Sequence, residues 1–428
     1  MRMIGYNRFS TSQPWDYSAN IYQPGSAANN FAPSVHGTSV FTNSGTVDPY
    51  PYVEPRTPAQ RAAYNPFFGG NWPTSALEDA LNPNFNEGYA QEWNFTVQRE
   101  IAKDYSVSVS YVGNHAVGLW ISREFNWGIP LPFPNLSTCT AGNTNPNCPQ
   151  NQLSSLPTRR RLSSIQCNTG VAGVTGPCYG PFELEDNAAW STYNSLQISV
   201  NHKFKHGIEF LGSYVWGRYL DIESYGAEGG TGPRDPYNLG LSYGPSDNDV
   251  RHRFVISYIW QVPKMKRFSG ASSALLNGWQ VQGITTIQSG SPFTVSSGVD
   301  TALTGIGGET ADLVAGQRPT LAHTSKAQEI SEWFNTSAFQ VAAWGTYGQS
   351  ARNMLYGPGI VNFDFSLFKE FMISERWGRI QFRNEYFNLF NHANFYNPDS
   401  NLADGSAFGQ IFNARDPRFI QFALKWVF

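Results

Sequence analysis

The feature that most constrains this chain is a repeated alternation of apolar and polar residues with a period of two. In residues 93–101 the apolar side chains Trp93, Phe95, Val97 and Ile101 share one parity, which only Arg99 interrupts. Such a period places successive side chains on opposite faces of a β-strand. The pattern predicts nine strands, at residues 93–101, 105–111, 196–204, 208–216, 254–262, 279–288, 361–367, 380–390 and 420–428.

The length and the faces of these strands favour a membrane. Most have nine residues or more, as a tilted membrane strand requires, whereas strands of soluble proteins average about five to six residues. The second face is rich in Ser, Asn, Gln, Glu and Lys and is too polar for a dry core. Aromatic residues near the ends of the apolar faces resemble the girdles at lipid headgroups: Trp93, Tyr105, Trp216, Trp260, Trp279 and Trp426. We therefore predict an all-β fold, a transmembrane antiparallel β-barrel.

Composition excludes two other classes of protein. No stretch approaches the roughly 18 consecutive apolar residues of a membrane helix. The formal net charge is -3 and no large basic cluster occurs, so nucleic acid is not an expected partner. Charged residues make up 14% of the chain, which is little more than half the share in an average soluble protein. Aromatic residues make up 15%.

The connections between the strands alternate in length. Residues 102–104, 205–207 and 372–376 form short turns and 263–276 a moderate one, whereas long segments separate the other strands. Outer-membrane barrels have short periplasmic turns and long extracellular loops. This rule puts Phe428 on the periplasmic side. By the same rule, residues 1–88 are an extracellular loop region ahead of the first clear strand, with an earlier strand expected at 4–9. Residues 89–428 are the barrel part.

Four cysteines form two close pairs in one predicted external loop, Cys139 with Cys148 and Cys167 with Cys178. Their spacing lacks the CxxC pattern and the His partners of a zinc site. Two local disulfides are the favoured reading, with free thiols and a metal site as alternatives. The N-terminus has no secretory apolar core, so the protein either stays inside the cell or begins further upstream. The disulfides favour the upstream start.

Several motifs together resemble the barrel of Oar-like TonB-dependent receptors. They are distributed over most of residues 88–428 and stand at residues 89–100, 110–114, 193–197, 246–254, 278–280, 288–293, 333–335, 386–392 and 414–418. The resemblance implies a 22-stranded outer-membrane barrel closed by an N-terminal plug, which the TonB system engages, and often a regulatory β-domain ahead of the plug. The sequence shows no plug, coupling motif or regulatory domain. We therefore expect about nine strands from the C-terminal portion of such a barrel.

The last strand also resembles the signal that the barrel assembly machinery reads. Outer-membrane barrels typically finish with an alternating strand and a terminal aromatic residue. The matching residues here are Ile420, Phe422, Leu424, Trp426 and Phe428. The alternative is that Phe428 is only the last lipid-facing side chain.

Parity predicts the residues of the barrel lumen. In a complete receptor they would contact the plug or line the transport path, the alternative being simple solvation. They are Glu92, Asn94, Gln98, Gln197, Asn201, Lys203, Gln280, Gln282, Asn362, Asp364, Gln381, Arg383, Glu385, Gln421 and Lys425. Selection of an unknown solute would rest on the external loops, notably 124–190 and 291–359, where Trp, Tyr and Asn are available.

The sequence does not predict an enzyme, a metal site or a cofactor. Asp247 and Asp249 resemble part of a calcium loop without its other ligands, and we expect them to face Arg251 and Arg253 near the external mouth. The main hypothesis is an outer-membrane TonB-dependent receptor that moves a bulky solute. A cell-surface binding or adhesion barrel without transport is the alternative, and a soluble secreted β-sandwich is a third, disfavoured class.

Overall fold

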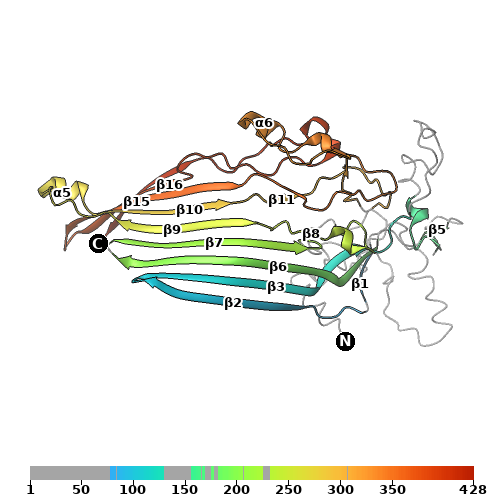
Figure 1. The fold of residues 1–428 in the computed structure, drawn as a ribbon, viewed down its shortest axis with the longest axis horizontal. Coiled ribbons are helices and arrows are strands. Elements are labelled where there is room, and N and C mark those ends of the chain that lie inside the picture. Colours follow the sequence, from blue (N-terminus) through green and yellow to red (C-terminus); the bar gives the residue numbers. More distant parts are fainter. Residues whose placement is uncertain are drawn as a thin grey trace, which may run out of the picture.

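The computed structural model describes residues 78–82, 84–129, 156–164, 166–168, 175–177, 182–205, 207–224, 232–305 and 307–428. Most of this part of the chain forms one sheet of long antiparallel strands (Figure 1). Its nine long strands are β2 Tyr89–Ala102, β3 Tyr105–Glu124, β6 Phe182–Lys205, β7 Ile208–Asp221, β9 His252–Gln261, β10 Trp279–Gln288, β15 Ile360–Ser374, β16 Gly378–Phe387 and β17 Phe419–Val427.

All nine strands predicted from the alternation are confirmed, and each pairs with its neighbours in chain order. The largest differences are in β3 and β6, which extend well past the alternating segments. Their upper halves stay paired through register shifts between Val117 and Leu119 and between Leu119 and Ile121. Each shift disturbs the two-residue period, so periodicity alone ends these strands too early.

The register keeps most apolar residues of the strands on one face, and Leu211, Ile259 and Ile284 are exceptions that lie on the other. One row of paired residues crosses seven strands and consists of Val97, Val109, Ile198, Tyr214, Phe254, Ile287 and Val361. The adjacent row points the other way and consists of Gln98, Ser108, Ser199, Ser213, Val255, Thr286 and Asn362. We call these the apolar face and the polar face. On interior strands the large side chains Trp216 and Tyr111 are 54% and 45% exposed on the apolar face, as contact with lipid requires.

Aromatic rings on the apolar face cover glycines of the neighbouring strand. The ring of Trp93 lies over Gly113, where a Cβ atom would stand 2.1 Å from the indole nitrogen. Tyr258 covers Gly283 in the same way, with its hydroxyl 2.5 Å from such a Cβ. A glycine therefore lets a large ring lie flat on the sheet, and any other residue at these two positions would displace the ring.

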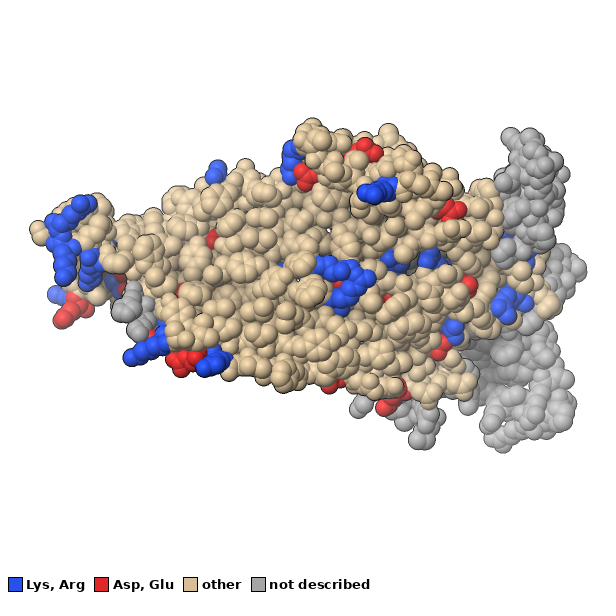
Figure 2. Space-filling model, in the orientation of Figure 1, with Lys and Arg blue, Asp and Glu red and all other residues tan. Residues whose placement is uncertain are grey.

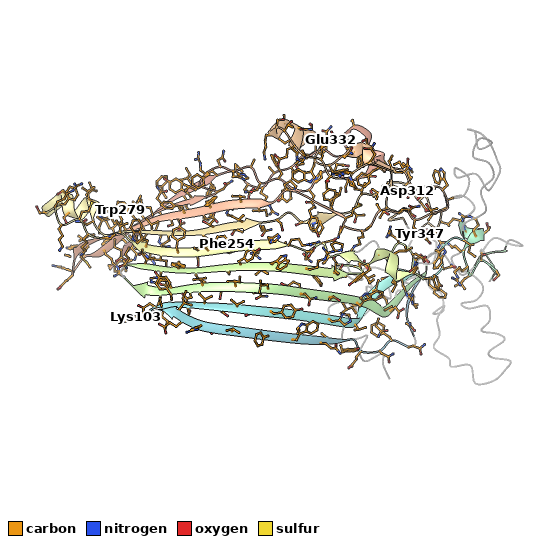
Figure 3. All side chains as sticks on the ribbon, viewed as in Figure 1. Lys103, Phe254, Trp279, Asp312, Glu332 and Tyr347 are labelled. Atoms are coloured by element: carbon orange, nitrogen blue, oxygen red, sulfur yellow. The ribbon has the colours of Figure 1, made fainter. Side chains whose placement is uncertain are left out.

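Turns and loops separate to opposite ends of the sheet. The β2–β3, β6–β7, β9–β10 and β15–β16 turns lie at the end that carries the C-terminus and α5 (Figure 1). The long segments lie at the other end, where the labelled Asp312 and Tyr347 also stand (Figure 3). The remaining elements are β1 Glu78–Leu81, β4 Gln166–Asn168, β5 Thr175–Pro177, η5 Leu239–Ser242, β8 Gly244–Pro245, α5 Gly270–Leu276, β11 Pro292–Phe293, β12 Asp312–Leu313, α6 Lys326–Ser331, η6 Thr336–Ala338, β13 Phe339–Gln340, β14 Leu355–Tyr356 and η7 Leu402–Ala407.

The sheet is open. Among the described residues β2 and β17 each pair with one long strand and not with each other, so no closed barrel forms within this part of the chain. β1 adds a short parallel pair at the loop end of β6, through Glu78–Leu81. None of the described helices has the length and apolar character needed to cross a membrane.

Candidate functional site

The external segments fold into a unit with its own core. Buried residues of the β10–β15 segment pack against Phe408 of the β16–β17 segment. Phe334 stands at the centre, with its ring centroid 5.6 Å from Phe293, 5.6 Å from Phe339 and 5.1 Å from Phe408. This cluster, which we call the external core, fixes the backbone that carries the polar residues of the mouth.

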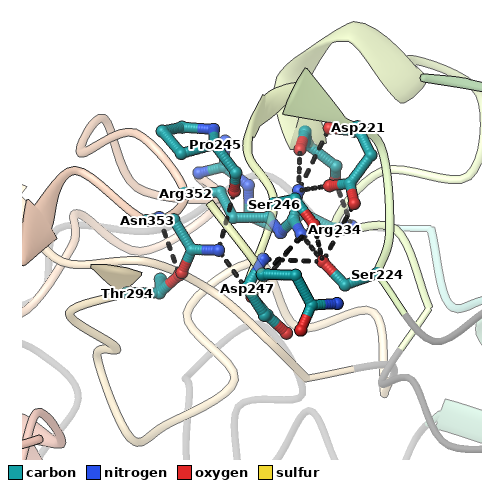
Figure 4. Close-up of polar contacts among 11 residues, drawn as sticks. Asp221, Ser224, Arg234, Pro245, Ser246, Asp247, Thr294, Arg352 and Asn353 are labelled. Atoms are coloured by element: carbon teal, nitrogen blue, oxygen red, sulfur yellow. Dashed lines mark hydrogen bonds and ion pairs between the residues drawn. The ribbon is translucent and has the colours of Figure 1, made fainter. Parts of the chain in front are cut away.

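Arg352 ties the external core to the top of the sheet (Figure 4). Its Nη1 stands 2.7 Å from Oδ1 of Asp221, the last residue of β7, and donates to the Asp221 carbonyl at 3.1 Å. Nη2 donates to Ser224 Oγ at 2.7 Å. The Asp221 side chain is buried, so the ion pair is largely removed from water and holds the two segments in one register.

Asp247 lies in the turn between β8 and β9, and its carboxylate pairs with residues of the β10–β15 segment. Its Oδ1 lies 3.6 Å from Arg352 Nη2 and accepts a hydrogen bond of 2.5 Å from Asn353 Nδ2. Asn353 adopts a left-handed backbone with φ 55° and also exchanges hydrogen bonds with Thr294. The prediction that Asp247 faces Arg251 and Arg253 is therefore wrong, because both of its partners come from a distant segment.

The same prediction is confirmed in part for Asp249. Its Oδ2 accepts from Arg251 Nε at 2.8 Å and from the Tyr356 hydroxyl at 2.7 Å, and its Oδ1 accepts from the Tyr219 backbone at 2.7 Å. Burial raises the pKa of Asp249, and the Tyr356 hydrogen bond opposes that rise. The pKa of Tyr356 is raised to about 12, first by burial and then by the Asp249 carboxylate. The hydroxyl therefore stays protonated and donates.

Arg234 makes a second link between external segments. It is buried, and its Nη1 donates to Thr310 Oγ1 at 2.6 Å and to the Ser350 carbonyl at 3.2 Å. A further hydrogen bond joins Nη2 to the Leu241 carbonyl. The guanidinium thereby satisfies acceptors of the β7–β9 and β10–β15 segments at once.

A buried carboxyl group of the external unit, Glu309, lies beside the half-buried Asp300. Glu309 is 3% exposed, and within the described residues its Oε1 has no hydrogen-bond partner. The pKa of Glu309 is raised to about 8, first by burial and then by its hydrogen bond with Asp300. Asp300 in turn accepts from the backbone nitrogens of Thr304 and Gly305, at 3.1 Å and 2.7 Å. The pair therefore holds a proton at neutral pH.

A cluster of three rings and a guanidinium lies at the loop end of the sheet, where Arg161 and Tyr237 are exposed and Phe125 and Trp127 are half-buried. The Arg161 guanidinium carbon stands 4.5 Å from the ring centroid of Tyr237, 5.2 Å from Trp127 and 6.0 Å from Phe125. Tyr237 is 47% exposed. We call these four residues the aromatic platform. The sequence carries no local signal for it, because Arg161 lies 34 residues from Trp127 in the chain.

The residues predicted for the lumen share the polar face. The strand pairing places 14 of the 15 on this face. The remaining residue, Lys203, lies within the register shift between His202 and Lys205. A hollow of about 450 Å³ lies against β7, β9, β10, β15 and β16, and its lining includes Gln282, Asp364 and Glu385. Their assignment to a barrel lumen stays a prediction.

The predicted assembly residues and cysteines fall in different parts of the structure. Ile420, Phe422, Leu424 and Trp426 lie on the apolar face, opposite Tyr386, Asn384, Phe382 and Ile380 of β16. Phe428 follows them and is 96% exposed. Cys139, Cys148 and Cys178 lie outside the described residues, as does the strand expected at 4–9, and for Cys167 only the backbone in β4 is described. The disulfides stay a prediction.

Comparison with solved structures finds outer-membrane proteins at low identity. The outer membrane transporter YddB from Escherichia coli matches with 8% identity and a TM-score of 0.43, over 82% of this chain and 34% of that one. FpvAI in complex with pyocin S2 matches with 10% identity and a TM-score of 0.31, over 79% and 26%. FpvA of P. aeruginosa bound to heterologous pyoverdines gives the same identity and TM-score, over 79% and 27%. The chain thus spans about a third or less of the length of these proteins.

A family comparison covers nearly the whole sequence. Among curated proteins none matches the chain. A family model described as an outer membrane beta barrel domain matches residues 4–421. This match agrees with the long antiparallel strands and their apolar and polar faces. The chain belongs to the outer membrane beta-barrel domain family and is an outer-membrane protein.

Proposed function

We propose that this chain supplies barrel strands and external loops to an Oar-like TonB-dependent receptor, which takes up a bulky solute across the outer membrane. The observation that carries the proposal is the polar face of the sheet, backed by an exposed apolar face and topped by a folded external unit. The polar face suits a path for a hydrated solute, and the apolar face suits contact with lipid. The folded external unit suits selection of the solute.

Capture would begin at the aromatic platform. Its rings offer stacking surfaces, and Arg161 offers a cation held over them, with the guanidinium 4.5 Å from the Tyr237 ring centroid. A solute with a planar or anionic group matches this combination. The links through Arg352 and Arg234 keep the external segments in place while the solute binds.

Passage would follow the polar face. The predicted lumen residues are mainly uncharged donors and acceptors. The hollow is lined by the carboxylates Glu209, Asp364 and Glu385 together with apolar side chains such as Leu211 and Ile284. Movement through the lumen would require rearrangement of a plug that TonB pulls, so the native protein should contain a plug and a TonB contact.

A surface binding protein without transport is the second candidate. The external core favours it, because a folded external unit is sufficient for binding and needs no energy coupling. The two functions differ in whether the native product contains a plug.

The deciding experiment is an immunoblot with N-terminal peptide sequencing of the native product in detergent-solubilised outer membranes. For transport we expect a mass well above 47.6 kDa and peptides upstream of Met1 that include a plug. A product at 47.6 kDa would overturn the plug-gated mechanism and favour the binding function. As a functional control, in-frame removal of the plug should abolish uptake and leave surface binding intact.

A further inference from the structure

The periplasmic end of the sheet carries a basic cluster beside a short amphipathic helix. Lys264, Lys266 and Arg267 precede α5 in the β9–β10 turn, and all three side chains are exposed. No ion pair with a described acidic residue is recorded for any of them, and residues 262–278 contain no Asp or Glu. Figure 2 shows several basic side chains, with acidic ones beside them, at the tip of the molecule where α5 lies in Figure 1.

The turn is held in a defined shape by one side chain. Asn277 Oδ1 accepts from the Met265 backbone nitrogen at 2.7 Å, and Asn277 Nδ2 donates to the Met265 carbonyl at 3.3 Å and to Ser273 Oγ at 3.0 Å. The basic residues are therefore attached to a fixed turn, and Arg267 is further held over the Phe268 ring at 4.7 Å.

A buried lysine fixes α5 on the apolar side of the sheet. Lys369 pairs with Trp279 across β10 and β15 and is 1% exposed. Its Nζ donates to the carbonyls of Leu275 and Asn277, at 2.9 Å and 2.5 Å, and lies 5.0 Å from the Trp279 ring centroid. Trp279 Nε1 donates to Leu275 O at 3.0 Å. The helix thus sits at the rim of the face that meets lipid, next to Trp279, a residue type found at bilayer interfaces.

Apolar and basic groups face outward together at this rim. Met265, Leu275 and Leu276 are exposed large apolar side chains of the same turn. Interfacial segments combine such residues with Lys and Arg, which attract anionic headgroups. We propose that this rim, formed by Lys264, Lys266 and Arg267 with Met265, Leu275 and Leu276, binds an anionic phospholipid of the periplasmic leaflet. The proposal rests on the membrane orientation of the sheet and is independent of solute transport.

The test measures lipid selectivity of the full chain, extracted from outer membranes in a zwitterionic detergent. Spin-labelled phosphatidylglycerol and phosphatidylcholine are added separately, and the motionally restricted fraction is measured. We expect preferential binding of phosphatidylglycerol. The variant Lys264→Gln/Lys266→Gln/Arg267→Gln should lower this preference by at least about tenfold. Equal binding of both lipids, or a preference that survives in the variant, would overturn the proposal.

A charge-matched control separates the site from net charge. Arg318, Lys326 and Arg415 are exposed cations of the external segments, and their triple replacement by Gln should leave the lipid preference unchanged. A loss in the control as well would assign the effect to net charge and contradict the proposal. Heat-modifiable migration on gels checks that each variant folds. If the triple variant does not fold, the single variant Lys266→Gln replaces it, and a smaller loss of lipid preference is expected. Displacement of the lipid by inorganic phosphate would make the site one for free phosphate and would also contradict the proposal.

Discussion

At the scale of the residue, Arg352 stands out because its main partner Asp221 is buried at the top of β7. Replacing Arg352 by Ala leaves that carboxylate without its cation, which costs about 3 kcal/mol in buried pairs. We expect the variant to lose protection of the β10–β15 segment in hydrogen exchange. The exposed Arg318 provides the matched control, because Arg318→Ala should change protection by less than about 0.5 kcal/mol. Equal protection in Arg352→Ala and wild type would contradict the role of this ion pair.

Glu309 predicts a dependence of stability on pH. Its pKa rises from 4.5 to about 8 on folding, so between these pH values the folded state holds a proton that the unfolded state releases. The stability of the external unit should therefore fall as pH rises from about 4.5 to 8, and should be highest below that window. Glu309→Gln removes the ionisable group and should be more stable than wild type at pH 8, by up to about 4 kcal/mol.

Thermal or denaturant unfolding of the external unit at pH 5 and pH 8 checks this expectation. At pH 5 the two proteins should differ little, because Glu309 is protonated in the folded wild type. Identical curves for the variant and the wild type at pH 8 would show that Glu309 ionises without cost in the folded protein.

At the scale of the element, adjacent residues of β9 test which face meets lipid. Ile256 lies on the apolar face and Ser257 on the polar face, near the middle of the strand. Lys at the bilayer midplane costs about 2–4 kcal/mol on a lipid-facing position, whereas a lumen position tolerates charge. Ile256→Lys should therefore lower the folded fraction in lipid vesicles, and Ser257→Lys should not. A larger loss of the folded fraction in Ser257→Lys than in Ile256→Lys would mean that the polar face, not the apolar face, meets lipid.

The last strand predicts a separation of assembly from stability. Phe428 is 96% exposed, and among the described residues its recorded ring contact is with Trp426, at a centroid distance of 5.6 Å. Phe428→Ala should therefore change the free energy of unfolding by less than about 0.5 kcal/mol. If the residue is read by the assembly machinery, the same variant should reach the outer membrane in reduced amount. Normal amounts in the membrane would leave Phe428 as a lipid-facing residue only.

Sequence periodicity predicted the strands well and the site poorly, for a physical reason. Alternation is a local property, so Trp93 or Phe254 reveals its face from its immediate neighbours. The residues that pair in the external segments are far apart in the chain. Arg352 lies 131 residues from Asp221, and Asn353 lies 106 residues from Asp247. A sequence places such residues in loops and carries no local signal for their pairing. The Asp247 prediction failed because it assumed a nearby partner.

At the scale of the whole molecule, the strands and the external unit form two bodies with separate sources of stability. Phe334 is 2% exposed and central in the external core, so Phe334→Ala should cost about 3–5 kcal/mol. We expect proteolysis of the external segments to rise sharply while heat-modifiable migration of the strands is kept. Phe412, which is 62% exposed, is the control, and Phe412→Ala should change neither. Loss of the strand signal in Phe334→Ala would mean that the two bodies unfold together.

The length of β6 bears on where a solute first meets the protein. Its 24 residues span about 80 Å along the strand and, at the usual tilt, about 60 Å along the membrane normal. The lipid-facing band of such proteins is only about 25 Å tall. Together with β3 on one side and β1 pairing with its upper end, β6 thus forms a wall that rises tens of ångströms above the bilayer. Under the proposed function, a solute would meet this wall before it reached the lipid.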